Sequence, residues 1–270
     1  IARSPDVPVV ERVEVQGDVG ARAGEVVRVH ASSDRVDELA FDLALGRVGG
    51  VVGRQGDGDG NDGDDGDGNK DAATATRQVD PHAVAAALAR MRAALPSWDG
   101  MAWLDALLAD SEALFPRVHG ILTGFIDLIF RFKGADGAHR YVVCDYKTNR
   151  LIPRFAGGAP RSSVRAASVS TRGCYTRAGL SEAMAEHGYH LQALLYTVAL
   201  HRLLRQRLGA AYDYDRHIAG HAYLFVRAME GPQTLRVAGW PLGVYVDRWP
   251  RAVVFALDAA LDGALPEEVP

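Results

Sequence analysis

The pattern of hydrophobic and polar positions predicts three strands in the N-terminal and middle parts of the chain. Apolar and polar residues partly alternate over 36–45, which is typical of a strand with one buried face. Ile, Leu and Phe dominate 120–132, and a short β-branched run follows at 140–146. The Gly- and Asp-containing residues between these two runs have the composition of a hairpin turn. We therefore expect one separate strand and a β-hairpin.

Two helices are expected before the hairpin. Pro81 suits the first turn of a helix, and Asp80 directly before it suits the N-cap position. The Ala- and Leu-rich residues that follow extend this helix to Pro96. A second run with helical character covers 101–115. These helices separate the first strand from the hairpin.

The remaining elements follow the hairpin. Apolar residues at helical spacing predict one long helix over 181–208, which Gly188 can interrupt near its start. A strand is expected over 220–228 and a closing helix over 250–261. The order of strand, helices, hairpin, helix, strand and helix predicts an α/β fold with a mixed central β-sheet flanked by helices.

Composition narrows the class of protein. The chain has 270 residues, of which 48% are hydrophobic and 24% charged, as in ordinary globular proteins. No apolar run approaches the ~20 residues of a membrane-spanning helix. Its two cysteines exclude a disulfide framework and a four-cysteine cluster built from this chain alone. A reducing, cytoplasmic location without membrane association is expected.

Charge is unevenly distributed. The 31 residues from 50 to 80 include eight Asp, and their Gly/Asp repeats carry too few apolar side chains to form a core. We expect a disordered acidic insertion there, and its spacing does not match a calcium-binding EF-hand loop. Seven Lys or Arg and no acidic residue lie within 146–177. This predicts a basic loop at about 150–180, which either attracts a polyanion or is simply solvated.

The predicted hairpin carries the residues with the clearest chemistry. Asp145 and Lys147 are two apart on one strand, so both side chains should project to the same side. Pairing of the hairpin can bring Asp127 beside Asp145. Two neighbouring carboxylates repel each other, and a hard divalent cation such as Mg²⁺ would offset that repulsion. The alternative is an Asp–Lys ion pair at the end of the sheet with Asp127 solvated.

Three blocks of sequence carry a resemblance to a known family. Together, in order and character, they resemble the RecB-type nuclease domains of the PD-(D/E)xK superfamily. The blocks are GFIDLIFRF at 124–132, YVVCDYKTN at 141–149 and YHLQALLYTVALHRLLRQRL at 189–208. The resemblance implies a restriction-endonuclease-like core. It also implies a Mg²⁺-dependent DNA exonuclease or endonuclease, with Mn²⁺ as an alternative metal, acting in double-strand break repair and recombination.

The resemblance implies roles for five residues. Asp127 and Asp145 would be metal ligands, joined by the backbone carbonyl of Tyr146. Lys147 would be the catalytic lysine near the attacking water. Glu38 resembles a further acidic residue that the family has ahead of the hairpin. No residue matches the family's upstream histidine ligand, which we expect before Ile1 in a longer protein.

Two further pairs are expected to contact DNA. Gln192 and Tyr196 match the family's Gln-x-x-x-Tyr motif and share one helix face, where the alternative is ordinary surface packing. Arg150 and Arg154 belong to the basic segment and would hold the DNA backbone.

The expected organisation is an irregular segment over 1–35 that belongs to a truncated domain, followed by a nuclease domain over 36–270. The resemblance implies DNA as a partner, together with RecC-type and RecD-type subunits of a RecBCD-type helicase–nuclease heterotrimer. Two alternatives stay open. One is a non-catalytic nuclease-like module that binds DNA or a partner protein. The other is a stand-alone nuclease of the same superfamily.

Overall fold

A computed structural model covers the chain and describes most of the expected nuclease domain. The predicted irregular segment 1–35 (apart from Arg35), the acidic insertion and most of the basic loop lie outside the described residues. The described residues are 35–46, 78–98, 100–110, 117, 119–152 and 171–265.

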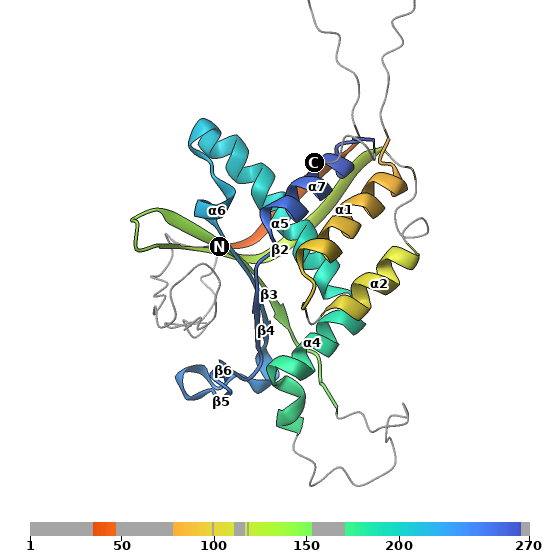
Figure 1. Ribbon diagram of the computed structural model, residues 1–270. Coiled ribbons are helices and arrows are strands. Elements are labelled where there is room, and N and C mark those ends of the chain that lie inside the picture. The colour runs from red at the N-terminus through yellow and green to blue at the C-terminus, as the bar shows by residue number, and fades with distance from the viewer. Residues whose placement is uncertain are drawn as a thin grey trace, which may run out of the picture.

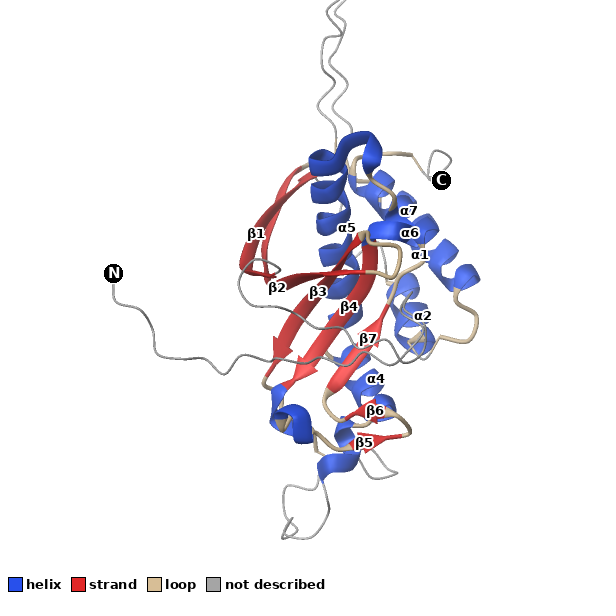
Figure 2. Ribbon diagram, turned by 90° about the vertical axis from the view of Figure 1, so that its left-hand side faces the viewer, coloured by secondary structure: helices blue, strands red, loops and turns tan. Residues whose placement is uncertain are grey.

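A five-stranded mixed sheet with the order β1-β2-β3-β4-β7 forms the centre of the structure (Figures 1 and 2). β2 runs antiparallel to both β1 and β3, β4 runs parallel to β3, and β7 closes the edge antiparallel to β4. The strands are β1 (Arg35–Leu45), β2 (Gly120–Lys133), β3 (His139–Lys147), β4 (Ile218–Phe225) and β7 (Val244–Asp247). The first strand and the hairpin are thus confirmed.

Helices α1, α5 and α7 lie together on one face of the sheet (Figure 2). The helices are α1 (Pro81–Ala94), α2 (Met101–Ala109), α4 (Arg177–Glu186), α5 (Tyr189–Leu208), α6 (Tyr214–His217) and α7 (Arg251–Leu261). This α/β arrangement confirms the predicted fold class and is consistent with a restriction-endonuclease-like core. Among the described helices, none combines the length and the apolar character needed to cross a membrane.

The start of α1 is as predicted. Asp80 has extended backbone geometry, and its Oδ1 accepts a hydrogen bond from the backbone N–H of His82 at 2.9 Å. This contact satisfies one of the N–H groups that a helix leaves unpaired at its first turn. The second predicted helix begins at Met101 but ends at Ala109, where Asp110 leaves helical geometry, so it is shorter than the predicted 101–115.

The helix predicted over 181–208 is divided at Gly188, the residue expected to interrupt it. The structure has two helices, α4 and α5, which meet at Gly188 with φ +67°. This left-handed conformation is easy for glycine and unfavourable for other L-residues, so the chain turns there. The apolar spacing continues across the break because both helices pack against the same core. Periodicity alone therefore did not separate them.

The predicted strand 220–228 is too long at its C-terminal end. β4 ends at Phe225, and 226–228 form a 3₁₀ turn instead. Three short strands were also missed: β7, and the two-residue strands β5 (Arg236–Val237) and β6 (Trp240–Pro241) that pair as a small hairpin. Segments of two to four residues are too short to show strand periodicity.

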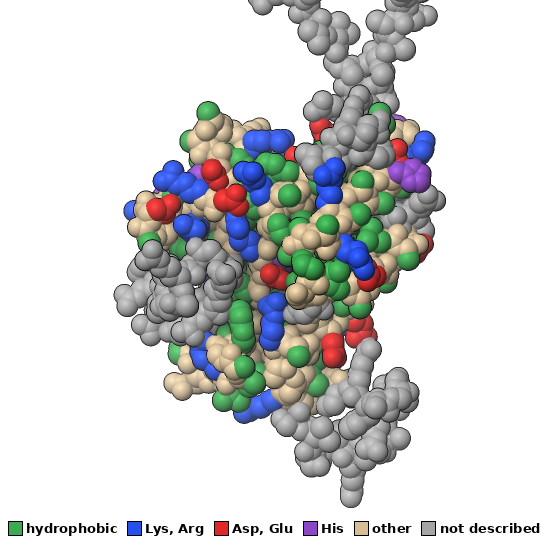
Figure 3. Space-filling model, viewed as in Figure 1, with side chains coloured by type: hydrophobic (Ala, Val, Ile, Leu, Met, Phe, Trp, Pro, Cys, Tyr) green, Lys and Arg blue, Asp and Glu red, His purple; other side chains and the backbone are tan. Residues whose placement is uncertain are grey.

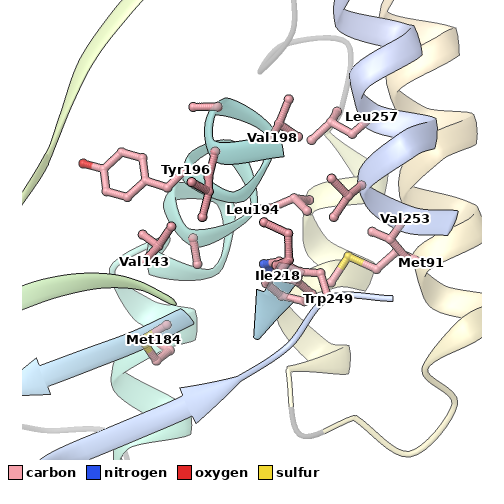
Figure 4. Packing of buried hydrophobic residues seen from close by; sticks show 14 of the residues in the cluster. Met91, Val143, Met184, Leu194, Tyr196, Val198, Ile218, Trp249, Val253 and Leu257 are labelled. Atoms are coloured by element: carbon pink, nitrogen blue, oxygen red, sulfur yellow. The ribbon is translucent and has the colours of Figure 1, made fainter. Parts of the chain in front are cut away.

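The core beneath the sheet fixes the position of α5. Leu194 and Val198 lie on the side of α5 that meets α7, where Val253 and Leu257 complete the contact (Figure 4). All four side chains are at most 1% exposed, and burying such a side chain contributes about 1.5–3 kcal/mol. Tyr196 points away from α7 (Figure 4), so α5 presents a second, partly polar face to the strands.

Candidate active site

Three acidic residues lie level with one another on neighbouring strands. The paired residues on either side place Glu38 of β1 opposite Asp127 of β2. The β2–β3 register then brings Asp127 to the level of Asp145 in β3. Asp127 Oδ2 accepts a hydrogen bond from the backbone N–H of Tyr146 at 3.0 Å. The hairpin therefore brings the two aspartates together, as predicted.

The regular strand pattern is interrupted at this level. Ile126 and Ile129 both join the larger core beneath the helices, whereas Leu128 joins the smaller core on the opposite face, so alternation fails at residue 127. On the neighbouring strand, Glu38 has φ +52°, a conformation that costs a non-glycine residue about 1–3 kcal/mol. Glu38 is exposed, and the paired residues of β1 and β2 continue on both sides of it.

Asp145 is the buried carboxylate of the group, at 3% exposure. Its Oδ2 lies 2.6 Å from Lys147 Nζ, so the two side chains project to the same side as predicted, and they form the ion pair that the alternative interpretation expected. The contact is not aligned as a hydrogen bond, and the buried Oδ2 has no aligned donor. Burial raises the pKa of Asp145, the Lys147 ammonium opposes that rise, and the charge of Asp127 adds to it.

Lys147 is held from the helix side as well. Its Nζ donates a hydrogen bond to Gln192 Oε1 at 3.0 Å, and the Tyr223 hydroxyl donates to the same oxygen at 3.1 Å. Gln192 Nε2 donates to the Tyr196 hydroxyl at 2.8 Å. The Gln-x-x-x-Tyr pair thus connects α5 to Lys147. Its expected contact with DNA stays a prediction.

Two tyrosines near Lys147 had no role in the sequence analysis. The Lys147 ammonium lies 3.9 Å from the centre of the Tyr189 ring and 5.2 Å from that of Tyr223. Tyr189 is three residues before Gln192 and so shares its helix face, which is a signal the sequence does contain. Tyr223 could not be identified from the sequence in this way, because its place beside Asp145 depends on the parallel pairing of β3 with β4.

The remaining predicted site residues are only partly described. The Tyr146 side chain is 38% exposed, and a metal contact by its carbonyl stays a prediction. Arg150 is exposed just beyond β3, and Arg154 lies outside the described residues. On the face drawn in Figure 3, Lys and Arg side chains are scattered among acidic and apolar ones, so charge on that face does not by itself outline a DNA path.

The donor set is suited to a hard cation with few protein ligands. Asp127 and Asp145 offer carboxylate oxygens, and the unaligned buried Oδ2 of Asp145 fits a role as a metal ligand. Within the described part of the chain, no group of three or more His, Cys, Asp or Glu side chains is placed to hold a metal. Mg²⁺ commonly uses one or two carboxylates with water and substrate phosphate, so two aspartates suffice for that mode.

The mixed sheet and the aspartate–lysine group define a class of protein: an α/β domain with a restriction-endonuclease-like core. Comparison with known proteins narrows this class. No family model matches the chain. Eight curated relatives do match, and each is named RecBCD enzyme subunit RecB.

The similarity to RecB is substantial over the matched part. The chain is 38% identical to RecB of Escherichia coli over 167 residues, or 61% of this chain. It is 41% identical to RecB of Mycobacterium tuberculosis H37Rv over 145 residues, or 54% of this chain. It is 36% identical to RecB of Mycolicibacterium smegmatis over 176 residues, or 65% of this chain. The chain is therefore similar to RecB over about half to two thirds of its length.

The matched region is a small part of each relative. It spans 12% of the E. coli protein, 11% of the M. tuberculosis protein and 15% of the M. smegmatis protein.

Proposed function

We propose that this domain hydrolyses DNA phosphodiester bonds with the help of Mg²⁺, as the nuclease part of a RecB-type enzyme. The observation that carries the proposal is the buried carboxylate of Asp145, which pairs with Lys147 and lies beside the second carboxylate, Asp127, on the neighbouring strand. Two carboxylates and a lysine on adjacent strands are costly to gather without a function. RecB similarity supports the nuclease assignment.

Asp127 and Asp145 would hold the metal, with the backbone carbonyl of Tyr146 as a further ligand and Glu38 as an acidic neighbour. When bound, Mg²⁺ or Mn²⁺ supplies positive charge that stabilises the attacked phosphate and makes water more acidic. The hydrogen bond from Tyr146 N–H to Asp127 leaves the other oxygen of that carboxylate available. The buried carboxylate of Asp145, paired with Lys147, belongs to the same cluster.

Lys147 is the residue that would meet the reacting group. Its ammonium can donate a hydrogen bond to a phosphate oxygen and stabilise negative charge as it increases there. It can also orient the attacking water. Gln192 and Asp145 hold the ammonium in place, because each contacts Nζ at 3.0 Å or less.

DNA would be held mainly through its backbone. Arg150 and Arg154 follow Lys147 in the first part of the basic segment, and positive side chains there would bind phosphates. Gln192 and Tyr196 lie beside Lys147 and would border the strand that enters the site. Because phosphate contacts carry no base information, sequence preference should be weak.

The names of the relatives suggest the larger setting. Each is a subunit of a RecBCD enzyme. We therefore propose that the full-length protein works with RecC-type and RecD-type partners in a helicase–nuclease that acts in double-strand break repair and recombination.

The test is Mg²⁺-dependent DNA degradation by the purified full-length enzyme. Asp145→Ala should abolish it, because the substitution removes a metal ligand and the partner of Lys147. Asp42→Ala removes an exposed carboxylate from β1 and should leave the rate unchanged. Wild-type rates in the Asp145 variant, with contaminating nucleases excluded by an in-gel activity assay, would refute the proposal.

One observation favours a second candidate, a nuclease-like module that binds DNA without cutting it. Lys147 Nζ already pairs with the buried Oδ2 of Asp145 at 2.6 Å, which a plain ion pair at the end of the sheet would also show. Such a module would bind DNA equally well with and without Asp127 and Asp145, and it would show no metal-dependent cleavage. Filter binding and cleavage assays on the same preparations separate the two candidates.

A further inference from the structure

We propose that Tyr189 is a positioning residue for Lys147, and that its ring rather than its hydroxyl does this work. The Lys147 ammonium lies 3.9 Å from the centre of the Tyr189 ring, within the range of a cation–π interaction. Its two closest polar partners are the carboxylate of Asp145 and the amide oxygen of Gln192. Two aromatic rings complete the contacts of the ammonium, and Tyr189 is the nearer, since the centre of the Tyr223 ring lies 5.2 Å away.

The Tyr189 ring is itself fixed by its surroundings. Its hydroxyl donates a hydrogen bond to Asn149 Oδ1 at 3.1 Å, and the ring stacks on Tyr223 with centroids 5.7 Å apart and planes 27° from parallel. Tyr189 is also the first residue of α5, directly after the left-handed Gly188. Because its hydroxyl, its ring face and its backbone are all fixed, the Tyr189 ring can restrain the flexible side chain of Lys147.

A neutral ring suits this position better than another acid. Asp127 and Asp145 already bring two negative charges close together, because they lie at the same level of neighbouring strands. A further carboxylate beside Lys147 would strengthen the hold on the ammonium but would repel an incoming phosphodiester. The π face of a tyrosine attracts a cation without adding net charge. Tyr189 thus restrains Lys147 while leaving the site open to an anion.

The inference rests on the proposed function and adds a residue to it. Removing the ring should release the ammonium from the nearer of its two aromatic contacts. In the full-length enzyme, Tyr189→Leu should lower kcat about 10-fold while KM for DNA stays within about twofold. Tyr189→Phe keeps the ring and should stay within about twofold of wild type in both constants. If kcat of the Tyr189→Phe enzyme fell as far as that of the Tyr189→Leu enzyme, the effect would belong to the hydroxyl and the proposal would be overturned.

A second measurement does not depend on catalysis. Acetylation of lysines by limiting reagent in the metal-free protein, read by mass spectrometry, reports how freely Lys147 moves toward solvent. Exposed Lys133 at the end of β2 provides the internal reference. The ratio of Lys147 to Lys133 labelling should rise about threefold or more in Tyr189→Leu and stay unchanged in Tyr189→Phe. An unchanged ratio in the Leu variant would refute the inference.

Failure of the proposed function and failure of the inference about Tyr189 can be distinguished. Absence of metal-dependent cleavage in wild-type enzyme would defeat the proposed function, yet the labelling ratio would still decide whether the ring restrains Lys147.

Thermal unfolding checks that each variant is folded. If Tyr189→Leu does not unfold cooperatively, Tyr189→Met takes its place, since methionine fills an irregular apolar space without offering a π face. Wild-type kcat and labelling in a folded variant that lacks the ring would contradict the proposal.

Discussion

Asp127 on β2 accepts a hydrogen bond from the backbone N–H of Tyr146 on β3, at 3.0 Å. This bond ties the two strands together at the residue that separates Asp145 from Lys147. The carboxylate therefore has a structural contact as well as its proposed role as a metal ligand. Asparagine retains an oxygen that can accept the N–H, whereas alanine does not, so the two roles can be separated.

Asp127→Asn should fold normally and lose metal-dependent cleavage. We expect its free energy of unfolding to stay within about 0.5 kcal/mol of wild type, while Asp127→Ala loses about 1 kcal/mol from the missing hydrogen bond. Urea denaturation measures the stability of both variants, and a plasmid degradation assay measures activity. Full activity in Asp127→Asn would contradict the proposed role of its charge.

Gln192 and Tyr223 should be coupled in stability. The Tyr223 hydroxyl, on a fully buried side chain, donates to Gln192 Oε1, so Gln192→Leu leaves that hydroxyl without its acceptor. The single substitution should destabilise the fold by about 1–3 kcal/mol. In a double-mutant cycle, adding Tyr223→Phe to the Gln192→Leu protein should recover about 1 kcal/mol of this loss. Strictly additive losses would show that the hydrogen bond contributes nothing.

Stability should fall in mild acid because of His221. Burial lowers the pKa of this fully buried histidine from 6.5 to about 4, while Asp247 raises it and Arg177 lowers it by smaller amounts. Between these two values the unfolded chain binds a proton that the folded protein excludes, so stability decreases as pH falls. At about pH 5 the loss from this residue is about 2 kcal/mol relative to neutral pH.

The measurement is urea denaturation of wild type and His221→Phe at neutral pH and in mild acid. The Phe variant keeps an aromatic ring beside Trp249, on which His221 stacks, but cannot titrate. Its stability should therefore depend less on pH than that of the wild type. Equal pH dependence in both proteins would mean that His221 is not the group responsible.

Gly188 should tolerate asparagine better than alanine. Its φ of +67° is left-handed, and a Cβ added at this position would meet no atom within 4 Å, so backbone strain rather than collision sets the cost. Gly188→Ala should lose about 1 kcal/mol, and Gly188→Asn less, because asparagine adopts this conformation more readily. Thermal unfolding ranks the variants. A more stable alanine variant would contradict the described break between α4 and α5.

The sequence anticipated the parts of the site that depend on local spacing. Asp145 and Lys147 form an ion pair because residues two apart on a strand project to the same side. The hairpin that carries Asp127 was visible from its two apolar runs and the turn between them. Asp80 was likewise visible as a helix cap because it directly precedes Pro81.

What could not be predicted depends on contacts between distant segments. Tyr223 comes beside Asp145 only through parallel pairing of β3 and β4, whose register local pattern does not specify. The left-handed backbone of Glu38 lies opposite Asp127, at a position missing from the regular pairing of the two strands, and an alternating sequence pattern gives no sign of it. The cation–π contact of Tyr189 required the position of α5 over the sheet, which the distant core residues of α7 determine.

Calorimetric titration of Mn²⁺ or Mg²⁺ into the full-length protein tests the central claim most directly. If Asp127 and Asp145 share one hard cation, wild type should show a saturable binding heat that disappears in Asp127→Ala and in Asp145→Ala and persists in Asp42→Ala. The same heat in all four proteins would contradict the account, because the two aspartates would then have no part in holding the metal.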